Sequence, residues 1–237
     1  MKWKILVGMA LAIGLMSAVP AHAVIDLTYD DTLKDIQQTN NNPCVIGSPS
    51  CNNPAGFPFT SVPGGPGPQD QQNSVTGLDG KLGNADGFTY TVGQITTLMG
   101  SQTMNLLIDV NQACGDATGC PISLTKVDVL INGVVQMSLT PVPQTVPLSG
   151  SLQGNGYSDA GITGLNFSSF KSTDTVDFHI VWTNQTDGQE SFFLAATNAQ
   201  TCEQLGNCPV PEPSALILLG AGLVVVAVVA QRKFRRN

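Results

Sequence analysis

Apolar side chains recur at every second position in several stretches between residues 88 and 194. This period of two is typical of β-strands that turn one face toward a core. The clearest sets are Phe88/Tyr90/Val92, Leu106/Ile108/Val110, Val127/Val129/Ile131, Val135/Met137/Leu139 and Val176/Phe178/Ile180/Trp182. The pattern predicts a strand at each set and a further one at 192–194.

Turn residues separate these predicted strands. Asn132-Gly133 is a strong signal for a two-residue hairpin, and the segment 184–189 contains Asp187-Gly188. Short connections of this kind join antiparallel neighbours. The sequence therefore predicts an all-β fold, an antiparallel β-sandwich or jelly-roll-like domain. Short helical turns are expected only at 31–38 and 164–170.

Long irregular loops interrupt the strand pattern. The segment 39–76 is rich in Pro, Gly and Asn, which makes continuous regular structure improbable there. A second proline-rich connection covers 141–147. We expect the exported domain to span 24–209, with 39–76 as its longest loop.

The first 23 residues have the three parts of a secretory signal peptide. Two lysines near the start precede the apolar run 5–18, and Ala21 and Ala23 form an A-x-A cleavage signal. Cleavage there places the new N-terminus at Val24. The alternative is an uncleaved N-terminal anchor.

The C-terminal end also consists of distinct segments in a clear succession. The segment 215–230 carries no charge and, as a helix, rises about 24 Å, which is short but sufficient for a membrane span. A basic cluster follows it at Arg232, Lys233, Arg235 and Arg236. Because positive charge stays in the cytoplasm, the C-terminus is predicted to lie in the cytoplasm. Residues 24–209, called the body below, are then predicted to lie outside the cytoplasmic membrane.

Just before that apolar segment stands the box Val210-Pro211-Glu212-Pro213. A V-P-E-P box, a short apolar helix and an Arg-rich end over 210–237 resemble the PEP-CTERM sorting signal of exopolysaccharide-producing Gram-negative bacteria. The resemblance implies recognition and removal of the tail by an exosortase, a membrane-embedded protease. It concerns routing alone, and a permanent C-terminal anchor is the alternative.

Charge excludes some functions for the body. Only 11% of residues are charged, and between residues 24 and 210 four lysines face 16 acidic residues with no arginine. Nucleic-acid binding needs a basic face, so we expect no nucleic-acid partner. The same deficit removes arginine-based anion sites.

Six cysteines, all in the exported part, form three close pairs: Cys44/Cys51, Cys114/Cys120 and Cys202/Cys208. An even number in an oxidising compartment indicates disulfides. Local pairing is the simplest of the fifteen connectivities, because each pair encloses a short loop rich in turn-forming residues. Metal or redox thiol sites are the alternatives.

Catalytic signals are sparse. His179 is the only histidine of the body, and it stands at an outward position of a predicted strand. A triad would need it beside a nucleophile and an acid. Glu190 and Glu203 are the body's only glutamates, and the sequence does not bring them together. We therefore expect no enzymatic activity, with a secreted hydrolase as the least favoured alternative.

The sequence indicates binding sites less clearly than it indicates the export of the chain. Asp79, Asn84 and Asp86 lie in a glycine-rich segment whose oxygens suit calcium, although the spacing is not that of an EF-hand. No other cofactor is expected. For carbohydrate binding, Tyr157 is a candidate exposed platform, whereas Trp182 is in phase with core residues.

Together these features predict an exported, non-catalytic protein of the cell surface or extracellular matrix. The role expected is structural or adhesive, in exopolysaccharide or biofilm. A carbohydrate-binding module, with or without calcium, is the alternative. The expected partners are an exosortase, the cytoplasmic membrane before processing, and exopolysaccharide.

Overall fold

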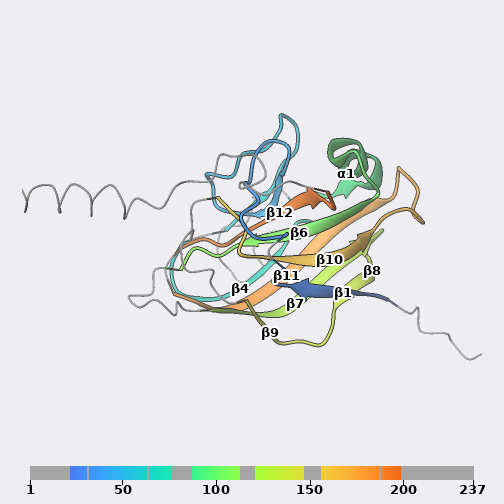
Figure 1. Cartoon of the computed structure of the whole chain (residues 1–237). Coiled ribbons are helices and arrows are strands. Elements are labelled where there is room, and N and C mark those ends of the chain that lie inside the picture. The colour runs from blue at the N-terminus through green and yellow to red at the C-terminus, as the bar shows by residue number, and fades with distance from the viewer. Residues whose placement is uncertain are drawn as a thin grey trace, which may run out of the picture.

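The computed structural model describes residues 22–30, 32–62, 64–75, 87–112, 121–146, 156–186 and 188–198 (Figure 1). These residues form twelve strands and one helix. The elements are β1 (Ala23–Thr28), β2 (Cys44–Gly47), β3 (Thr60–Ser61), β4 (Gly67–Gln72), β5 (Tyr90–Thr91), α1 (Val92–Met99), β6 (Thr103–Asp109), β7 (Ile122–Ile131), β8 (Val134–Leu139), β9 (Gln144–Val146), β10 (Ala160–Asn166), β11 (Thr175–Gln185) and β12 (Ser191–Ala196). The predicted β-rich fold is confirmed.

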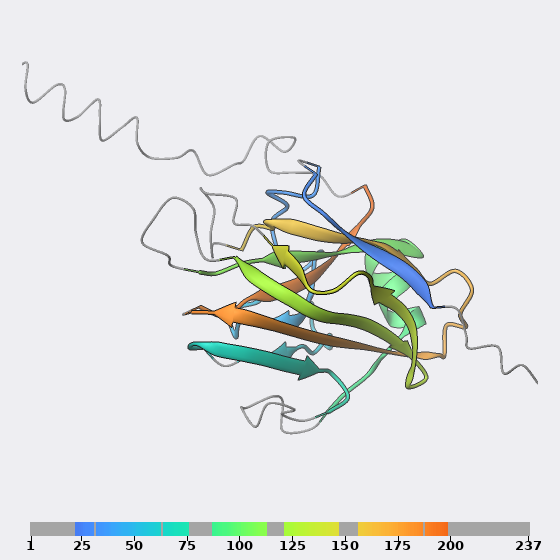
Figure 2. The same ribbon diagram turned by 90° about the horizontal axis from the view of Figure 1, so that it is seen from below.

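One hydrogen-bonded sheet contains all of these strands. Its main path runs β3-β2-β12-β6-β10-β1-β8-β7-β11-β4, and β5 and β9 pair with β11 and β7. Figure 2 shows β4, β11, β7, β8 and β1 side by side, with β10 beyond β1. Strand β1 pairs antiparallel with β10 and parallel with β8, so it joins a β7–β11 half to a β6–β12 half.

The two halves pack face to face around an apolar core. The indole of Trp182 on β11 lies 5.1 Å, between ring centroids, from the ring of Phe192 on β12. Both side chains are fully buried. The predicted sandwich is therefore a single sheet folded over on itself rather than two separate sheets.

The period-two pattern predicts β7, β8 and β11 correctly. The hairpin between β7 and β8 turns at Asn132 and Gly133, whose φ angles are +51° and +75°. Positive φ at both central residues is the geometry that Asn-Gly favours. Trp182 lies in the core, as its phase with Val176 and Ile180 predicts.

Strands β6 and β12 are buried on both faces. A second apolar cluster, which includes Leu33 and Ile36, covers Leu107 of β6 and Phe193 of β12 on the side away from the main core. Asp109, which lies between the alternating apolar positions Ile108 and Val110, is consequently only 7% exposed. The 32–38 segment thus acts as a cover for this half of the sheet.

The 39–76 segment contains more regular structure than the sequence predicts. Strands β2, β3 and β4 lie within it, and β2 and β3 pair in parallel. The sheet is therefore mainly but not wholly antiparallel. The proline-rich 141–147 connection also holds a strand, β9.

The expected strand at 88–92 is mostly wrong. Only Tyr90 and Thr91 form a strand, and the helix α1 begins at Val92. Thr91 Oγ1 accepts a hydrogen bond from the Gln94 backbone, while the Gln94 side chain accepts one from the Thr91 backbone. This reciprocal capping starts the helix.

The two expected helical turns are also wrong. Described residues 32–38 form turns and a bridge between Gln37 and Tyr157, with no helix. The residues at 164–166 belong to β10, and Phe170 N–H donates to Phe167 O in a simple turn. Tertiary pairing overrides the weak local preference in both cases.

A buried asparagine connects the two ends of the sheet path. Asn73, just after β4, donates from Nδ2 to Val45 O at 2.8 Å and to Thr60 Oγ1 at 2.9 Å. Its Oδ1 accepts from Phe178 N–H on β11 at 3.2 Å. These side-chain bonds join β4 to β2 and β3 where no backbone ladder is formed, and the folded sheet is nearly closed.

Candidate functional site

A polar pocket lies beside the second apolar cluster, where the 37–52 segment meets the end of β6 and the start of β12. Its volume is about 320 Å³, and it is partly open to solvent. The described residues that line it are Gln37, Gln38, Ser48, Ser50, Cys51, Asn52, Asp109, Asn111, Gly156, Gln189 and Ser191. Amide and hydroxyl groups dominate this wall.

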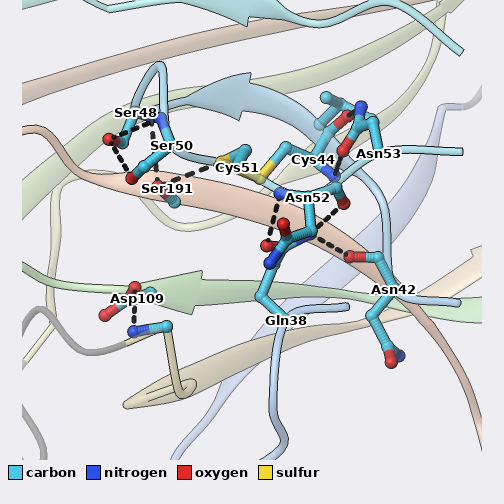
Figure 3. The surroundings of a disulfide bond; sticks show 12 residues. Gln38, Asn42, Cys44, Ser48, Ser50, Cys51, Asn52, Asn53, Asp109 and Ser191 are labelled. Atoms are coloured by element: carbon cyan, nitrogen blue, oxygen red, sulfur yellow. Dashed lines mark hydrogen bonds between the residues drawn. A yellow bond between two sulfur atoms is a disulfide. The ribbon is translucent and has the colours of Figure 1, made fainter. Parts of the chain in front are cut away.

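A disulfide between Cys44 and Cys51 holds one wall, as predicted for this pair (Figure 3). Cys44 is buried in β2, and the Cα atoms of the two cysteines are 6.1 Å apart. Ser191 Oγ, from the neighbouring β12, lies 3.5 Å from Cys51 Sγ and accepts from Ser48 N–H. The closed loop is thereby fastened to the sheet.

Gln38 fixes a second part of the wall. Its Nε2 donates to Asn42 O at 2.9 Å and to Asn52 O at 2.6 Å, while its Oε1 accepts from Asn52 N–H at 2.9 Å (Figure 3). The side chain is 7% exposed. A buried amide with both ends satisfied holds two loop segments in one arrangement.

The Asn53 side chain holds the backbone at Cys44 through hydrogen bonds in the same way. Its Oδ1 accepts from Cys44 N–H at 2.9 Å, and its Nδ2 donates to Cys44 O at 2.9 Å and to Phe57 O at 3.1 Å. The Asn-rich composition of 40–53, which predicts an irregular loop, therefore supplies the hydrogen bonds that order it.

The carboxyl groups of Asp109 and Asp159 accept hydrogen bonds from the backbone near the pocket. Asp109 Oδ2 accepts from Gly156 N–H at 3.1 Å, and Asp159 Oδ2 accepts from Val110 N–H at 2.8 Å. Asp109 lines the pocket, whereas Asp159 is not among its described lining residues. Asp109, the last residue of β6, therefore holds the backbone at Gly156, and Asp159 holds the backbone at Val110, just after β6.

Glu190 stands in the sequence between two lining residues, Gln189 and Ser191, and is fully buried. It accepts from Asn111 N–H at 2.6 Å and from the Gln112 side-chain amide. Burial raises the pKa of Glu190 to about 8; the two hydrogen bonds oppose this shift, and the charges of Asp109 and Asp159 add to it. At neutral pH the Glu190 carboxyl is consequently protonated and uncharged.

The lining therefore offers one acidic side chain, Asp109, among neutral amides and hydroxyls. Glu190 is shielded from any solute in the pocket by complete burial. Such a surface can donate and accept several hydrogen bonds at once. Acid–base hydrolysis of a glycoside would need two carboxyl groups flanking the bond, and the described lining presents only Asp109.

His179 lies on the opposite half of the sheet, on β11. Its Nε2 is 2.7 Å from Asp70 Oδ1, and its side chain is 15% exposed. On the neighbouring strands Ser138 donates to Asp128 at 2.7 Å. The histidine thus occupies the outward position that the sequence predicts and is hydrogen-bonded across strands to a carboxylate.

The expected aromatic platform is not formed. Tyr157 is only 6% exposed, because its backbone pairs with Gln37 and its ring is covered. Trp182 Nε1 donates to Gln185 Oε1 at 2.9 Å inside the core. Neither ring is available as a flat binding surface.

Several predicted sites lie outside the described residues: Asp79, Asn84, Asp86, Cys114, Cys120, Cys202, Cys208, Val210, Pro211, Glu212, Pro213, Arg232, Lys233, Arg235 and Arg236. Ala21 is also outside them, whereas Ala23 is the first residue of β1. Among the residues that are described, no three His, Cys, Asp or Glu side chains are grouped so as to hold a metal ion. The helix α1, the one described, is too short to span a membrane.

Sequence reasoning missed the pocket itself. Asn52 and Asn53 belong to the segment 39–76, which is predicted to be irregular. Gln38 belongs to a predicted helical turn, and Glu190 has no neighbour in sequence that marks it as buried. The one available signal was the Cys44/Cys51 pair, which predicts a closed loop but not its contact with β12.

Comparison with protein families identifies a motif at the C-terminal end. A profile of the PEP-CTERM protein-sorting motif matches residues 209–236. The chain carries a PEP-CTERM sorting signal. This motif implies export, processing at the membrane and an exosortase-type membrane enzyme as the processing partner.

The match covers the C-terminal tail alone and leaves the β-rich body unassigned. No curated protein and no solved structure matches the chain at a significant level. The role of the body therefore has to be argued from its own residues.

Proposed function

We propose that this chain is an exported, non-catalytic protein of the cell surface or extracellular matrix, with a structural or adhesive role in exopolysaccharide or biofilm. The PEP-CTERM motif at 209–236 carries the proposal. Residues 1–23 act as a cleaved signal peptide, and 215–230 hold the chain in the cytoplasmic membrane until an exosortase processes the tail.

The chemistry of the body supports a non-catalytic role. Its histidine, His179, is hydrogen-bonded to Asp70 on the outer face of the sheet. Buried Asp177 accepts from Ser74 N–H at 3.0 Å and from the Gln72 and Ser74 side chains. Carboxyl groups that satisfy backbone and side-chain donors in this way stabilise the fold.

Changing Pro211, Glu212 and Pro213 together to alanine tests the sorting function. We expect the full-length chain to accumulate in the cytoplasmic membrane, because the Pro-Glu-Pro box can no longer be recognised. Intact mass and cell fractionation in the native host measure the outcome: the unaltered chain should lack both 1–23 and the segment after the box.

The exposed Pro68 on β4 provides a matched control, since Pro68→Ala removes a proline outside the motif. This variant should be processed and exported as the unaltered chain is. If the triple variant keeps normal mass and location, the box is not a processing signal.

Carbohydrate binding is a second candidate function, favoured by the amide and hydroxyl lining of the pocket beside the disulfide. In its calcium-assisted form, Asp79, Asn84 and Asp86 would be the ligands. That form rests on the oxygen-bearing side chains and glycines of 79–87.

A further inference from the structure

The pocket beside the Cys44–Cys51 disulfide has the chemistry of a polyol site. Carboxamides such as Asn52 and Gln189 offer one donor group and one acceptor, and the Ser50 hydroxyl offers both. Sugar hydroxyls likewise donate and accept at each oxygen. A wall of these groups can therefore pair with adjacent hydroxyls on one ring.

The charge of the lining selects against acidic ligands. The described lining residues include no lysine, arginine or histidine, and they include the Asp109 carboxyl group. An anion in the pocket would meet that carboxylate without a compensating cation. Glu190, buried next to the lining residues Gln189 and Ser191 and protonated at neutral pH, adds no charge that would attract a cation.

The walls are ordered before any ligand binds. The disulfide, the Gln38–Asn52 bonds and the contact between Ser48 and Ser191 each fix a different part of the loop. A site whose backbone is already ordered loses less conformational entropy on binding.

We propose that this pocket binds a single neutral sugar unit by its hydroxyl groups, with Gln189 and Asp109 as specificity-determining contacts. The inference rests on the carbohydrate-binding candidate function and names its site and ligand class. The volume of about 320 Å³ is at the lower end of small-molecule sites, which suits one ring. The described lining contains no aromatic ring, so affinity for a free monosaccharide should be in the millimolar range.

Titration of the full chain with glucose, galactose and mannose tests the proposal. The chain is purified in a detergent that has no sugar headgroup, and binding is followed by NMR shifts or calorimetry. We expect saturable binding of at least one sugar with Kd of about 1–10 mM. Gln189→Ala should weaken it at least five-fold, whereas Gln102→Ala, an exposed glutamine between α1 and β6, should leave it unchanged.

Asp109→Asn separates a binding contact from a structural one. The asparagine Oδ1 can still accept from Gly156 N–H, so the local fold is retained. Glucuronate should bind the unaltered chain at least ten-fold more weakly than glucose, and Asp109→Asn should reduce that discrimination to less than three-fold. An unaltered chain that prefers glucuronate would overturn the assignment of a neutral ligand.

The remaining outcomes distinguish the site from the candidate function. If sugars bind but Gln189→Ala and Asp109→Asn change neither affinity nor discrimination, carbohydrate binding stands and the pocket is not its site. If neither the three sugars nor purified host exopolysaccharide binds, both the pocket assignment and the carbohydrate-binding function are wrong. Neither result affects the sorting function, which the Pro-Glu-Pro variant tests separately.

Discussion

Burial sets the protonation of Glu190 more strongly than its hydrogen bonds do. The side chain has no solvent exposure, and its pKa rises from 4.5 to about 8 although two amide groups donate to it. Because the folded state holds a proton that the unfolded state loses near pH 4.5, folding takes up a proton between these values. The ionisation of Glu190 therefore lowers the stability of the folded state as the pH rises.

Replacing Glu190 by glutamine should remove this pH dependence. In the unaltered protein Glu190 lowers the free energy of unfolding by about 1.4 kcal/mol for each pH unit between roughly pH 5 and pH 8. Above the folded pKa of about 8 this decline levels off. Denaturant unfolding at pH 5, 6, 7 and 8 measures the slope, and Glu190→Gln should be flatter by that amount.

Gln102, an exposed glutamine between α1 and β6 that carries no titratable group, provides the control. Gln102→Ala should keep the slope of the unaltered protein. An unchanged slope in Glu190→Gln would mean that Glu190 is ionised in the folded protein at neutral pH.

For single residues, the sequence predicts the packing of apolar side chains better than it predicts which polar side chains are buried. The phase of Trp182 with its strand neighbours places it correctly in the core. Tyr157 and Glu190 depend on which loop covers them, and that information is spread over residues distant in sequence. Alternation along one strand does not contain it.

The helix α1 shows where a strand pattern fails at the scale of elements. Its sequence contains Val92, Ile95 and two threonines, which favour strands, and a glycine. The buried positions Val92, Ile95 and Met99 nevertheless follow helical spacing. Thr91 and Gln94 form a capping box, a helix-start signal that the alternation of 88–92 conceals.

Loss of this cap should weaken the helix measurably. Thr91→Ala removes the acceptor for the Gln94 N–H and should lower the free energy of unfolding by about 1 kcal/mol. Thr91→Ser keeps a hydroxyl at the same place and should stay within about 0.5 kcal/mol of the unaltered protein. Chemical denaturation of the three proteins compares them, and equal losses in both variants would assign the effect to the methyl group's packing instead.

In strand β4 the sequence pattern predicts no regular structure where a strand forms. Its sequence, Gly-Pro-Gln-Asp-Gln-Gln, has no apolar residue and predicts a loop, yet it pairs with β11 along its length. Gln69 and Gln71 are buried there, and the Gln71 amide donates to Gln69 Oε1 at 3.4 Å. Long-range pairing with an already formed strand decides this element, and no local pattern reveals it.

The described part of the body is a single sheet folded at β1, and its two halves share the main apolar core. We expect the halves to unfold together because this shared core is much larger than the second cluster, which covers only the β6–β12 half. The hairpin and the long strands β7 and β11 could be predicted because their signals are local. The fold at β1 and the Asn73 connection could not, because each depends on strands that meet from distant parts of the chain.

Trp182 tests this coupling between the halves, since it packs on Phe192 across the core. Trp182→Ala removes that contact and the indole hydrogen bond to Gln185, and should lower the free energy of unfolding by about 3–5 kcal/mol. Hydrogen exchange followed by NMR measures the effect strand by strand. Amides of β7 and of β6 should lose protection equally, because one global unfolding event exposes both halves. Trp182→Phe, which keeps a ring against Phe192, should lose less in both strands. Protection lost in β7 but retained in β6 would show that the halves open independently, and would refute the shared core as the unit of stability.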